Sequence, residues 1–119
     1  MPRRNRVLGI LPTPLNVGKF ANMRGPRAEL ILKERFQLRE DLFAEVVIWR
    51  VPEPVRGSTH LFKYRLALVE NAVCLVRYDN EAGKGDHKHI GDDAVDYVFA
   101  GLDALQADFW AEIEQRLKR

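Results

Sequence analysis

Residues 60–80 constrain the fold most, because they carry the alternation of a β-hairpin. In HLFKYRLALV (60–69), Lys63 and Arg65 lie between apolar and aromatic side chains at the even positions. A strand with this period presents one apolar face and one polar face. After a short polar break, AVCLVRYDN (72–80) continues as a second strand. The sequence therefore predicts an antiparallel hairpin with a tight turn.

The turn of this hairpin can be centred on Glu70–Asn71 or on Asn71–Ala72. Both choices pair residues whose numbers have an odd sum, so even positions of the first strand share a face with odd positions of the second. We expect the apolar face to end in Arg77 and Asp79. The opposite face is then expected to carry Lys63, Arg65, Tyr78 and Asn80.

The remaining segments extend the hairpin into a sheet covered by a helix. AELILKERF (28–36) alternates like a strand but also fits a short helix, whereas LFAEVVIWRV (42–51) is rich in β-branched and aromatic residues and ends at Pro52. VDYVF (95–99) is a further short strand candidate. Residues 102–118 repeat apolar side chains at helical spacing. The predicted fold class is α+β, a small antiparallel β-sheet of about four to five strands packed by a C-terminal amphipathic helix.

Charge sets the beginning of the chain apart from the rest. The 119 residues carry a formal net charge of +2, yet residues 1–27 hold six basic and no acidic side chains. Residues 28–119 hold 13 basic and 17 acidic side chains, which does not favour a broad basic face for duplex DNA. We expect residues 1–27 to form a flexible basic extension and residues 28–119 to form a single α+β domain. Met23 is an alternative start of the chain.

Composition excludes several classes of protein. With 46% hydrophobic and 30% charged residues, the chain has the balance of a globular domain rather than of a disordered one. The longest uncharged run, residues 7–18, is too short for a membrane span. Cys74 is the one cysteine, which excludes an internal disulfide and fits the reducing cytoplasm. P-loop, GxSxG and dinucleotide-binding motifs are absent from the sequence.

The stretch RYDNEAGKGDHKHIGDD (77–93) contains the residues best suited to chemistry. His87 and His89 are two positions apart, so both imidazoles point the same way in extended chain. One imidazole could take a proton from a ribose 2′-hydroxyl and the other could return one to the leaving oxygen. Lys84 or Arg77 could stabilise the charge that gathers on phosphorus. The pattern is therefore consistent with phosphodiester cleavage.

Two other interpretations of the same stretch stay open. A Gly-rich polar segment after a hairpin is often a solvated loop. His-x-His with Asp86 or Asp79 also suits zinc or manganese, although a closed site needs more ligands than the pattern supplies. Asp86 could instead orient one of the histidines. We expect His60, at the start of a strand, to be structural.

The residues from Tyr64 to Gly91, YRLALVENAVCLVRYDNEAGKGDHKHIG, resemble the TumE family of bacterial toxin components. WRVPEPVRGSTH before them and a helix containing ADFW after them extend the resemblance over about residues 28–115. RYDNEAGKGDHKH is its most specific part. Members typically have Arg where this chain has Lys88, and often Gly where it has Ala72. We expect neither change to disable the protein, and the extension before Met23 is not typical of the family.

The resemblance implies the toxin of a type II toxin–antitoxin system. It also implies a cognate antitoxin, usually with a helix-turn-helix domain, that is encoded adjacently. Together with the histidine-containing stretch, it leads us to expect a toxin that arrests growth by RNA cleavage or translation block and uses no metal or other cofactor. The alternatives are a metal-dependent nuclease and a non-enzymatic module that binds nucleic acid or protein.

The residues expected to act fall into two groups. The expected catalytic residues are His87, His89, Lys84, Asp86 and Arg77. The expected substrate-binding residues are Tyr78, Asp79, Asn80, Lys88, Lys63 and Arg65. We expect the antitoxin to cover either the 77–93 stretch or the hairpin face that carries Lys63 and Arg65.

Overall fold

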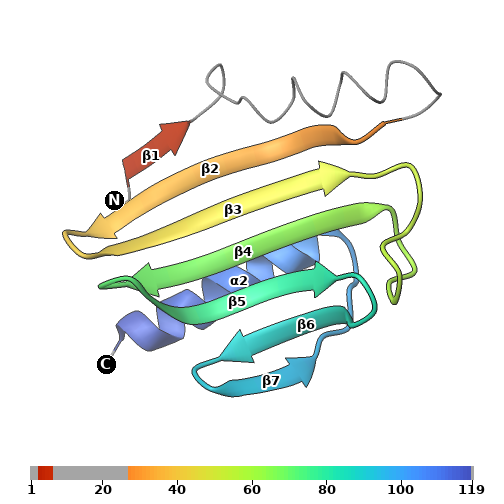
Figure 1. Ribbon diagram of the computed structural model, residues 1–119. Coiled ribbons are helices and arrows are strands. Elements are labelled where there is room, and N and C mark those ends of the chain that lie inside the picture. The colour runs from red at the N-terminus through yellow and green to blue at the C-terminus, as the bar shows by residue number, and fades with distance from the viewer. Residues whose placement is uncertain (1–2, 7–26, 119) are drawn as a thin grey trace.

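The computed structural model describes residues 3–6 and 27–118, which form one antiparallel sheet with a helix on one of its faces (Figure 1). Each strand pairs with the next along the chain, so the order in the sheet is β1-β2-β3-β4-β5-β6-β7. The elements are β1 (Arg3–Arg6), β2 (Glu29–Arg39), β3 (Leu42–Arg50), β4 (Phe62–Glu70), β5 (Val73–Glu81), β6 (Gly85–Ile90), β7 (Asp93–Asp96) and α2 (Leu102–Leu117).

The α+β prediction is confirmed in its main parts, an antiparallel sheet and a C-terminal helix. The predicted number of strands is wrong. The described part of residues 28–119 contains six strands, β2 to β7, and β1 adds a seventh from the basic extension. The extra strand in the domain arises because residues 77–93 are mostly paired: β5 runs on to Glu81, and β6 begins at Gly85 after a short turn. Most of the 1–27 extension, including Met23, lies outside the described residues.

The segment that also fitted a helix is a strand. β2 pairs with β3 from Glu29 opposite Arg50 to Arg39 opposite Leu42, with two local shifts in register. Alternate side chains of β2 face the core, because Leu32 and Phe36 lie on the same side as the buried residues of β3. Tertiary pairing thus decides between two conformations that the local sequence permits.

The turn between β4 and β5 is centred on Asn71 and Ala72. Both residues have positive φ, 50° and 67°, as in a type I′ turn, whose twist matches that of the two strands. Glu70 lies opposite Val73, which is one of the two registers that the sequence predicts. The hairpin therefore begins as expected.

One extra residue in β5 then changes the register. Val69 lies opposite Cys74, but Leu68 lies opposite Val76, so the pairing shifts by one residue as in a β-bulge. Beyond this shift every side chain of β5 lies on the other face from the one predicted. The expected faces are therefore wrong for four residues. Arg77 and Asp79 share a face with Arg65, whereas Tyr78 and Asn80 lie on the face of Leu66.

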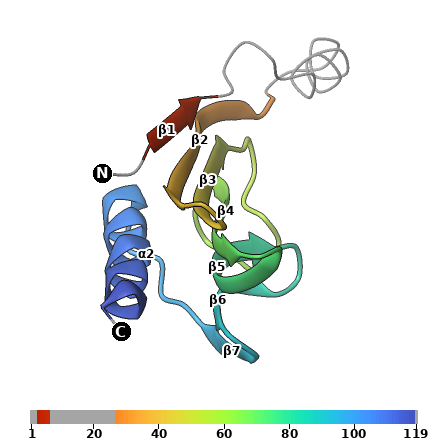
Figure 2. The same ribbon diagram turned by 90° about the vertical axis from the view of Figure 1, so that its left-hand side faces the viewer.

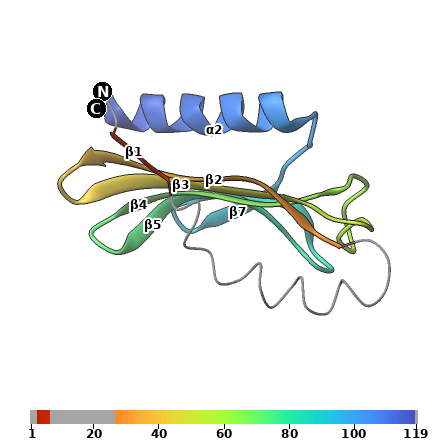
Figure 3. The same ribbon diagram turned by 90° about the horizontal axis from the view of Figure 1, so that it is seen from above.

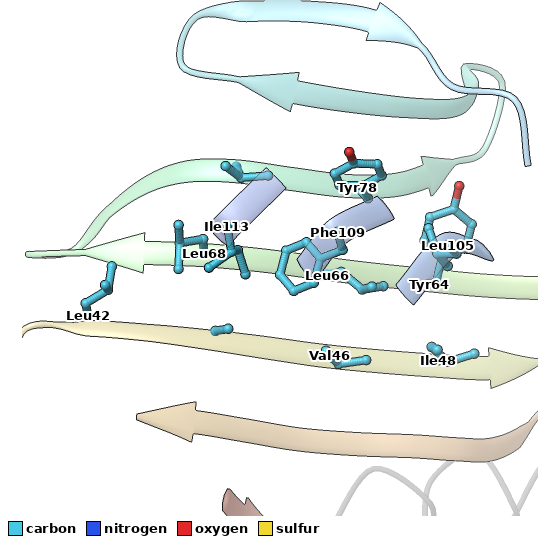
Figure 4. Packing of buried hydrophobic residues seen from close by; sticks show 12 residues of the cluster. Leu42, Val46, Ile48, Tyr64, Leu66, Leu68, Tyr78, Leu105, Phe109 and Ile113 are labelled. Atoms are coloured by element: carbon cyan, nitrogen blue, oxygen red, sulfur yellow. The ribbon is translucent and has the colours of Figure 1, made fainter. Parts of the chain in front are cut away.

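The core lies between the sheet and α2. Figure 4 shows Leu105, Phe109 and Ile113 of the helix against the apolar side chains of β3, β4 and β5. All three are at most 2% exposed, and burial of such side chains stabilises the fold by roughly 1.5–3 kcal/mol each. The helix begins after Gly101, whose φ of 113° suits glycine. The central strands of the sheet therefore use this face for packing against the helix.

The opposite face of the sheet has no described element packed on it, as Figures 2 and 3 show from two directions. Cross-strand register identifies the side chains that share it. We call it the open face. In β2 to β7 its polar and aromatic side chains are Lys33, Arg35, Gln37, Phe43, Glu45, Trp49, Lys63, Arg65, Arg77, Asp79, Glu81, His87, His89 and Asp96.

Candidate functional site

His87 and His89 lie side by side on the open face. Both belong to β6, and alternate residues of a strand project to the same side. Their ring centroids are 6.3 Å apart and the ring planes are inclined by 28°. The prediction that the two imidazoles point the same way is confirmed. The side chains keep 21% and 31% of their surface exposed, so both rings are accessible to a ligand.

Each imidazole faces a carboxylate on a neighbouring strand. Nε2 of His87 lies 3.6 Å from Oδ1 of Asp96 on β7. Nε2 of His89 lies 3.8 Å from Oδ1 of Asp79 on β5. Arg77 is directly opposite His89, and its Nε lies 3.0 Å from Oδ2 of Asp79. His87, His89, Asp79, Asp96 and Arg77 thus form a cluster of two imidazoles, two carboxylates and a guanidinium on the open face.

The two histidines differ in their electrostatic surroundings. Partial burial lowers the pKa of His89, and the nearby guanidinium of Arg77 lowers it further, against the opposing effect of Asp79. His89 is therefore neutral at pH 7 and can accept a proton. Nδ1 of His87 lies 2.9 Å from the carbonyl oxygen of Gly85, so Nδ1 donates a hydrogen there and Nε2 faces the open surface.

Cations continue from this cluster toward β4. Arg65 lies directly opposite Asp79, and its Nη1 is 3.7 Å from Oε1 of Glu45. Lys63 is exposed on the same strand. Lys84 is exposed in the turn between β5 and β6 rather than on the sheet. Three of the expected cations, Arg77, Lys63 and Arg65, are therefore brought to one face, whereas Lys84 lies at its edge.

Four of the expected site residues lie on the helix side of the sheet. Tyr78 is 2% exposed, and its ring lies edge-on to Phe109. Burial raises the pKa of Tyr78 to about 12, and the carboxylates of Glu112 and Asp108 contribute to this shift. Lys88 lies directly opposite Tyr78 and therefore also leaves the open face. The other two residues, Asn80 and Asp86, belong to a separate polar network.

Asp86 is the centre of this network. Ser58 Oγ and Tyr64 OH each donate a hydrogen bond to it at 2.6 Å, and Nε2 of His60 lies 2.7 Å from Oδ2. The backbone N–H of Phe62 donates to Nδ1 of His60, so Nε2 carries the hydrogen that points at Asp86. Both ring nitrogens of His60 are therefore used within the fold, which fits a structural role.

The network joins the loop after β3 to the start of β6. Asn80, 1% exposed, donates to Ser58 Oγ and to the Phe62 carbonyl, and its Oδ1 accepts from the Tyr64 N–H. Burial alone would raise the pKa of Asp86, but the hydrogen bonds from Ser58, Tyr64 and His60 lower it below its ordinary value. Asp86 therefore stays ionised and holds the segment that leads into His87.

Glycine is required where this loop meets the turn. Gly57 and Gly85 both have positive φ, 101° and 75°. A Cβ on Gly57 would come within 2.7 Å of the Gly85 nitrogen, and one on Gly85 within 2.8 Å of the Gly57 oxygen. The backbones thus approach each other more closely than any other residue type allows.

Sequence reasoning missed two residues of the open face, one next to the histidines and one on β3. Asp96 lies directly opposite His87, and Trp49 lies directly opposite Lys63. Asp96 could have been found from the alternation of DAVD (93–96), once that segment is recognised as a strand. The sequence places Trp49 in a strand but does not show on which face of the sheet its side chain lies. Asp96 and Trp49 can be assigned to the open face only from the pairing register of neighbouring strands, and the sequence of one segment does not determine that register.

No group of three or more His, Cys, Asp or Glu side chains in residues 27–118 is arranged to hold a metal ion. Within the described part of the chain, α2 is neither long nor apolar enough to cross a membrane.

The fold and its open face define a small α+β protein with an exposed imidazole–carboxylate cluster. The family model described as "Toxin TumE" matches residues 26–117. The chain therefore belongs to the TumE toxin family, and the resemblance noted over about residues 28–115 is confirmed. Neither the curated proteins nor the solved structures gave a match to the chain.

Proposed function

We propose that this toxin acts in the cytoplasm by cleaving RNA on the open face, with His87 and His89 as the proton-transfer pair and without a metal ion. The observation that carries the proposal is the pair of imidazoles 6.3 Å apart, each facing a carboxylate, on a face that no described element covers. Paired imidazoles suit general acid–base catalysis near neutral pH because their ordinary pKa is close to it.

The different surroundings of the two rings support separate roles in this proposal. His89, whose pKa is lowered, takes the proton from a ribose 2′-hydroxyl. The 2′-oxygen then bonds to phosphorus, the bond from phosphorus to the 5′-oxygen breaks, and His87 gives a proton to that leaving oxygen. The products are a 2′,3′-cyclic phosphate and a 5′-hydroxyl. Proton transfer of this kind contributes about 10²–10⁴-fold to a rate.

Arg77 supplies the charge stabilisation in this proposal. Its Nε is used by Asp79, but a guanidinium has further N–H donors that can contact phosphate oxygens. Arg65 and Lys63 bind neighbouring phosphates, and Lys84 binds one at the edge of the sheet. Asp79 holds Arg77 and faces His89, whereas Asp86, Asn80, Tyr78 and Lys88 act through the fold because they lie on the helix side.

The proposal includes the partner. In a type II system the antitoxin is a protein, and we propose one with a helix-turn-helix domain, encoded adjacently, that covers the open face at Lys63 and Arg65. Both side chains are exposed, so a partner can reach them without unfolding the sheet. Co-purification with the adjacent gene product, and its loss when both residues are changed to Glu, would test this part.

Inducible expression in a bacterial host tests the activity. Wild type is expected to stop growth and shorten cellular RNA, whereas His87→Ala, His89→Ala and Lys84→Ala are expected to weaken both effects. Lys118→Ala, an exposed cation at the end of α2, is the matched control and should behave as wild type. The purified protein should leave 2′,3′-cyclic phosphate ends in the presence of EDTA.

Each alternative has its own outcome in this experiment. Growth arrest that survives loss of both histidines would show a toxin that acts by binding. Loss of cleavage in EDTA, restored by a divalent metal, would show a metal-dependent nuclease. Absence of shortened RNA during arrest by wild type would remove the cleavage proposal.

A further inference from the structure

The open face has a hollow beside the histidine cluster. Its volume is about 240 Å³, and it lies over the ends of β3 and β4. The residues that line it are Glu45, Val47, Trp49, Lys63, Tyr64 and Arg65. An indole, an ammonium and a guanidinium thus border one shallow depression.

The indole of Trp49 is suited to stack on a ligand. Trp49 is half-buried and lies directly opposite Lys63 on the neighbouring strand. The other large aromatic side chain of β3 on this face, Phe43, already has the guanidinium of Arg35 3.5 Å from its ring centroid. Trp110, the second tryptophan of the chain, packs edge-on against Phe36 on the helix side.

Charge on the described open face is divided between its two halves. The half formed by β2, β3 and β4 carries Lys33, Arg35, Lys63 and Arg65 against Glu45. The half formed by β5, β6 and β7 carries Arg77 against Asp79, Glu81 and Asp96, together with both histidines. A polyanion is therefore attracted to the half that holds the hollow, next to the half that holds the imidazoles.

Register connects the two halves. Val47, Arg65, Asp79 and His87 lie in one row across β3, β4, β5 and β6. Three inter-strand spacings separate the ends of this row, about 14 Å at the usual distance between strands. A ligand that occupies the hollow and reaches His87 must therefore be an extended chain with several charged groups.

We propose that the hollow binds a base of single-stranded RNA, stacked on Trp49 with its flanking phosphates on Lys63 and Arg65, so that the next part of the strand crosses to His87 and His89. This inference rests on the proposed function and names its substrate class. An unpaired base offers the π-face that an indole can stack on, whereas a duplex hides it. Stacking is tolerant of sequence, so this subsite fixes the strand rather than choosing the base.

Binding can be measured apart from cleavage. The full chain with His87→Ala and His89→Ala is titrated against a fluorescein-labelled single-stranded RNA of mixed sequence, and its anisotropy gives Kd. Adding Trp49→Ala is expected to weaken binding about tenfold, within the range seen when one base–aromatic stack is lost. Trp49→Phe should recover part of the loss, and the same RNA annealed to its complement should bind more weakly.

A second measurement does not depend on how Trp49→Ala folds. In the same chain with His87→Ala and His89→Ala, Trp110→Phe leaves Trp49 as the remaining tryptophan. Addition of the unlabelled RNA should quench its fluorescence, and Lys63→Glu should shift the quenching to higher RNA concentration. A matched chain with Trp49→Phe and Trp110 retained should show little quenching.

The outcomes separate this inference from the proposed function. Unchanged Kd in the folded Trp49→Ala chain, or no quenching of Trp49, would overturn the inference, while RNA cleavage by wild type would leave the function intact. Trp49-dependent RNA binding with no cleavage by wild type would remove the function and keep the subsite. If Trp49→Ala loses the antitoxin but still binds RNA, the hollow is a protein interface and the inference fails.

Discussion

His60 and Asp86 are 26 residues apart in the sequence, yet Nε2 of His60 lies 2.7 Å from Oδ2 of Asp86. The same carboxylate accepts hydrogen bonds from Ser58 and Tyr64. An amide in its place offers one acceptor oxygen and a donor group that faces other donors. We expect Asp86→Asn to lower the free energy of unfolding by roughly 2 kcal/mol. Urea denaturation of wild type and Asp86→Asn measures this difference in unfolding free energy.

Asp92→Asn is the control for that change. Asp92 is exposed in the turn between β6 and β7, and its substitution should stay within about 0.5 kcal/mol of wild type. Equal stability of both variants would show that the hydrogen bonds to Asp86 contribute nothing measurable.

The stabilising effect of Asp86 is expected to depend on pH in a defined direction. Its pKa in the folded protein is below the ordinary value of 3.8, so the unfolded chain takes up the proton first as the pH falls. The difference in unfolding free energy between wild type and Asp86→Asn should therefore be constant from pH 7 to about pH 5. It should shrink as the pH falls below 3.8 and through the folded pKa. A difference that grows on acidification would contradict this.

Ala72 has φ of 67°, a conformation that L-residues adopt at a cost of roughly 1–2 kcal/mol. Glycine adopts it freely but loses more entropy on folding. Ala72→Gly should therefore raise the free energy of unfolding by about 0.5–1 kcal/mol. Ala82→Gly, in the turn before β6, is the control and should bring no gain, because Ala82 is not among the residues with positive φ. Thermal unfolding compares the two.

Arg77 is expected to control the protonation of His89. Its cation lowers the pKa of His89 in addition to the effect of burial, while Asp79 acts in the opposite direction. Arg77→Gln removes the cation and leaves Asp79 without its ion pair, so the pKa of His89 should rise. Arg39→Gln, at the end of β2, should leave it unchanged. An NMR titration of the histidine resonances measures both, and a fall in the His89 pKa in Arg77→Gln would contradict the arrangement described.

Tyr78 is expected to have no direct role at the open face. Its hydroxyl lies on the helix side, so Tyr78→Phe should keep RNA cleavage within about threefold of wild type, whereas His89→Ala should weaken it by about 10²-fold or more. Circular dichroism confirms that the variant is folded. Complete loss of cleavage by the folded variant would place Tyr78 in the reaction after all.

The sequence predicts β3, β4 and β5 because their alternation is local, but it does not predict which residues share a face. The shift between Leu68 and Val69 follows from how β5 lies on β4, and no pattern within 72–80 marks it. That one residue moves Arg77 and Asp79 to the open face and Tyr78 to the core. A prediction of faces from odd and even residue numbers holds only while the pairing register is unbroken.

The candidate site shows the same division between local and non-local information. The common side of His87 and His89 follows from their spacing alone, and so could be predicted. The hydrogen-bonding partners of Asp86 could not, because they come from a loop near Ser58 that is distant in sequence. Glycines at 83 and 85 suggested a loop, whereas they form the tight turn that starts β6.

The helix that covers the sheet is its last described element in chain order, which has a consequence for synthesis on the ribosome. Strands β2 to β7 can pair as they emerge, since each neighbours the next, but their apolar side stays uncovered until residues 102–117 have been made. A nascent chain of this toxin therefore exposes the apolar face of its sheet for most of its translation. A product that stops before Leu102 should be recognised and degraded rather than accumulate.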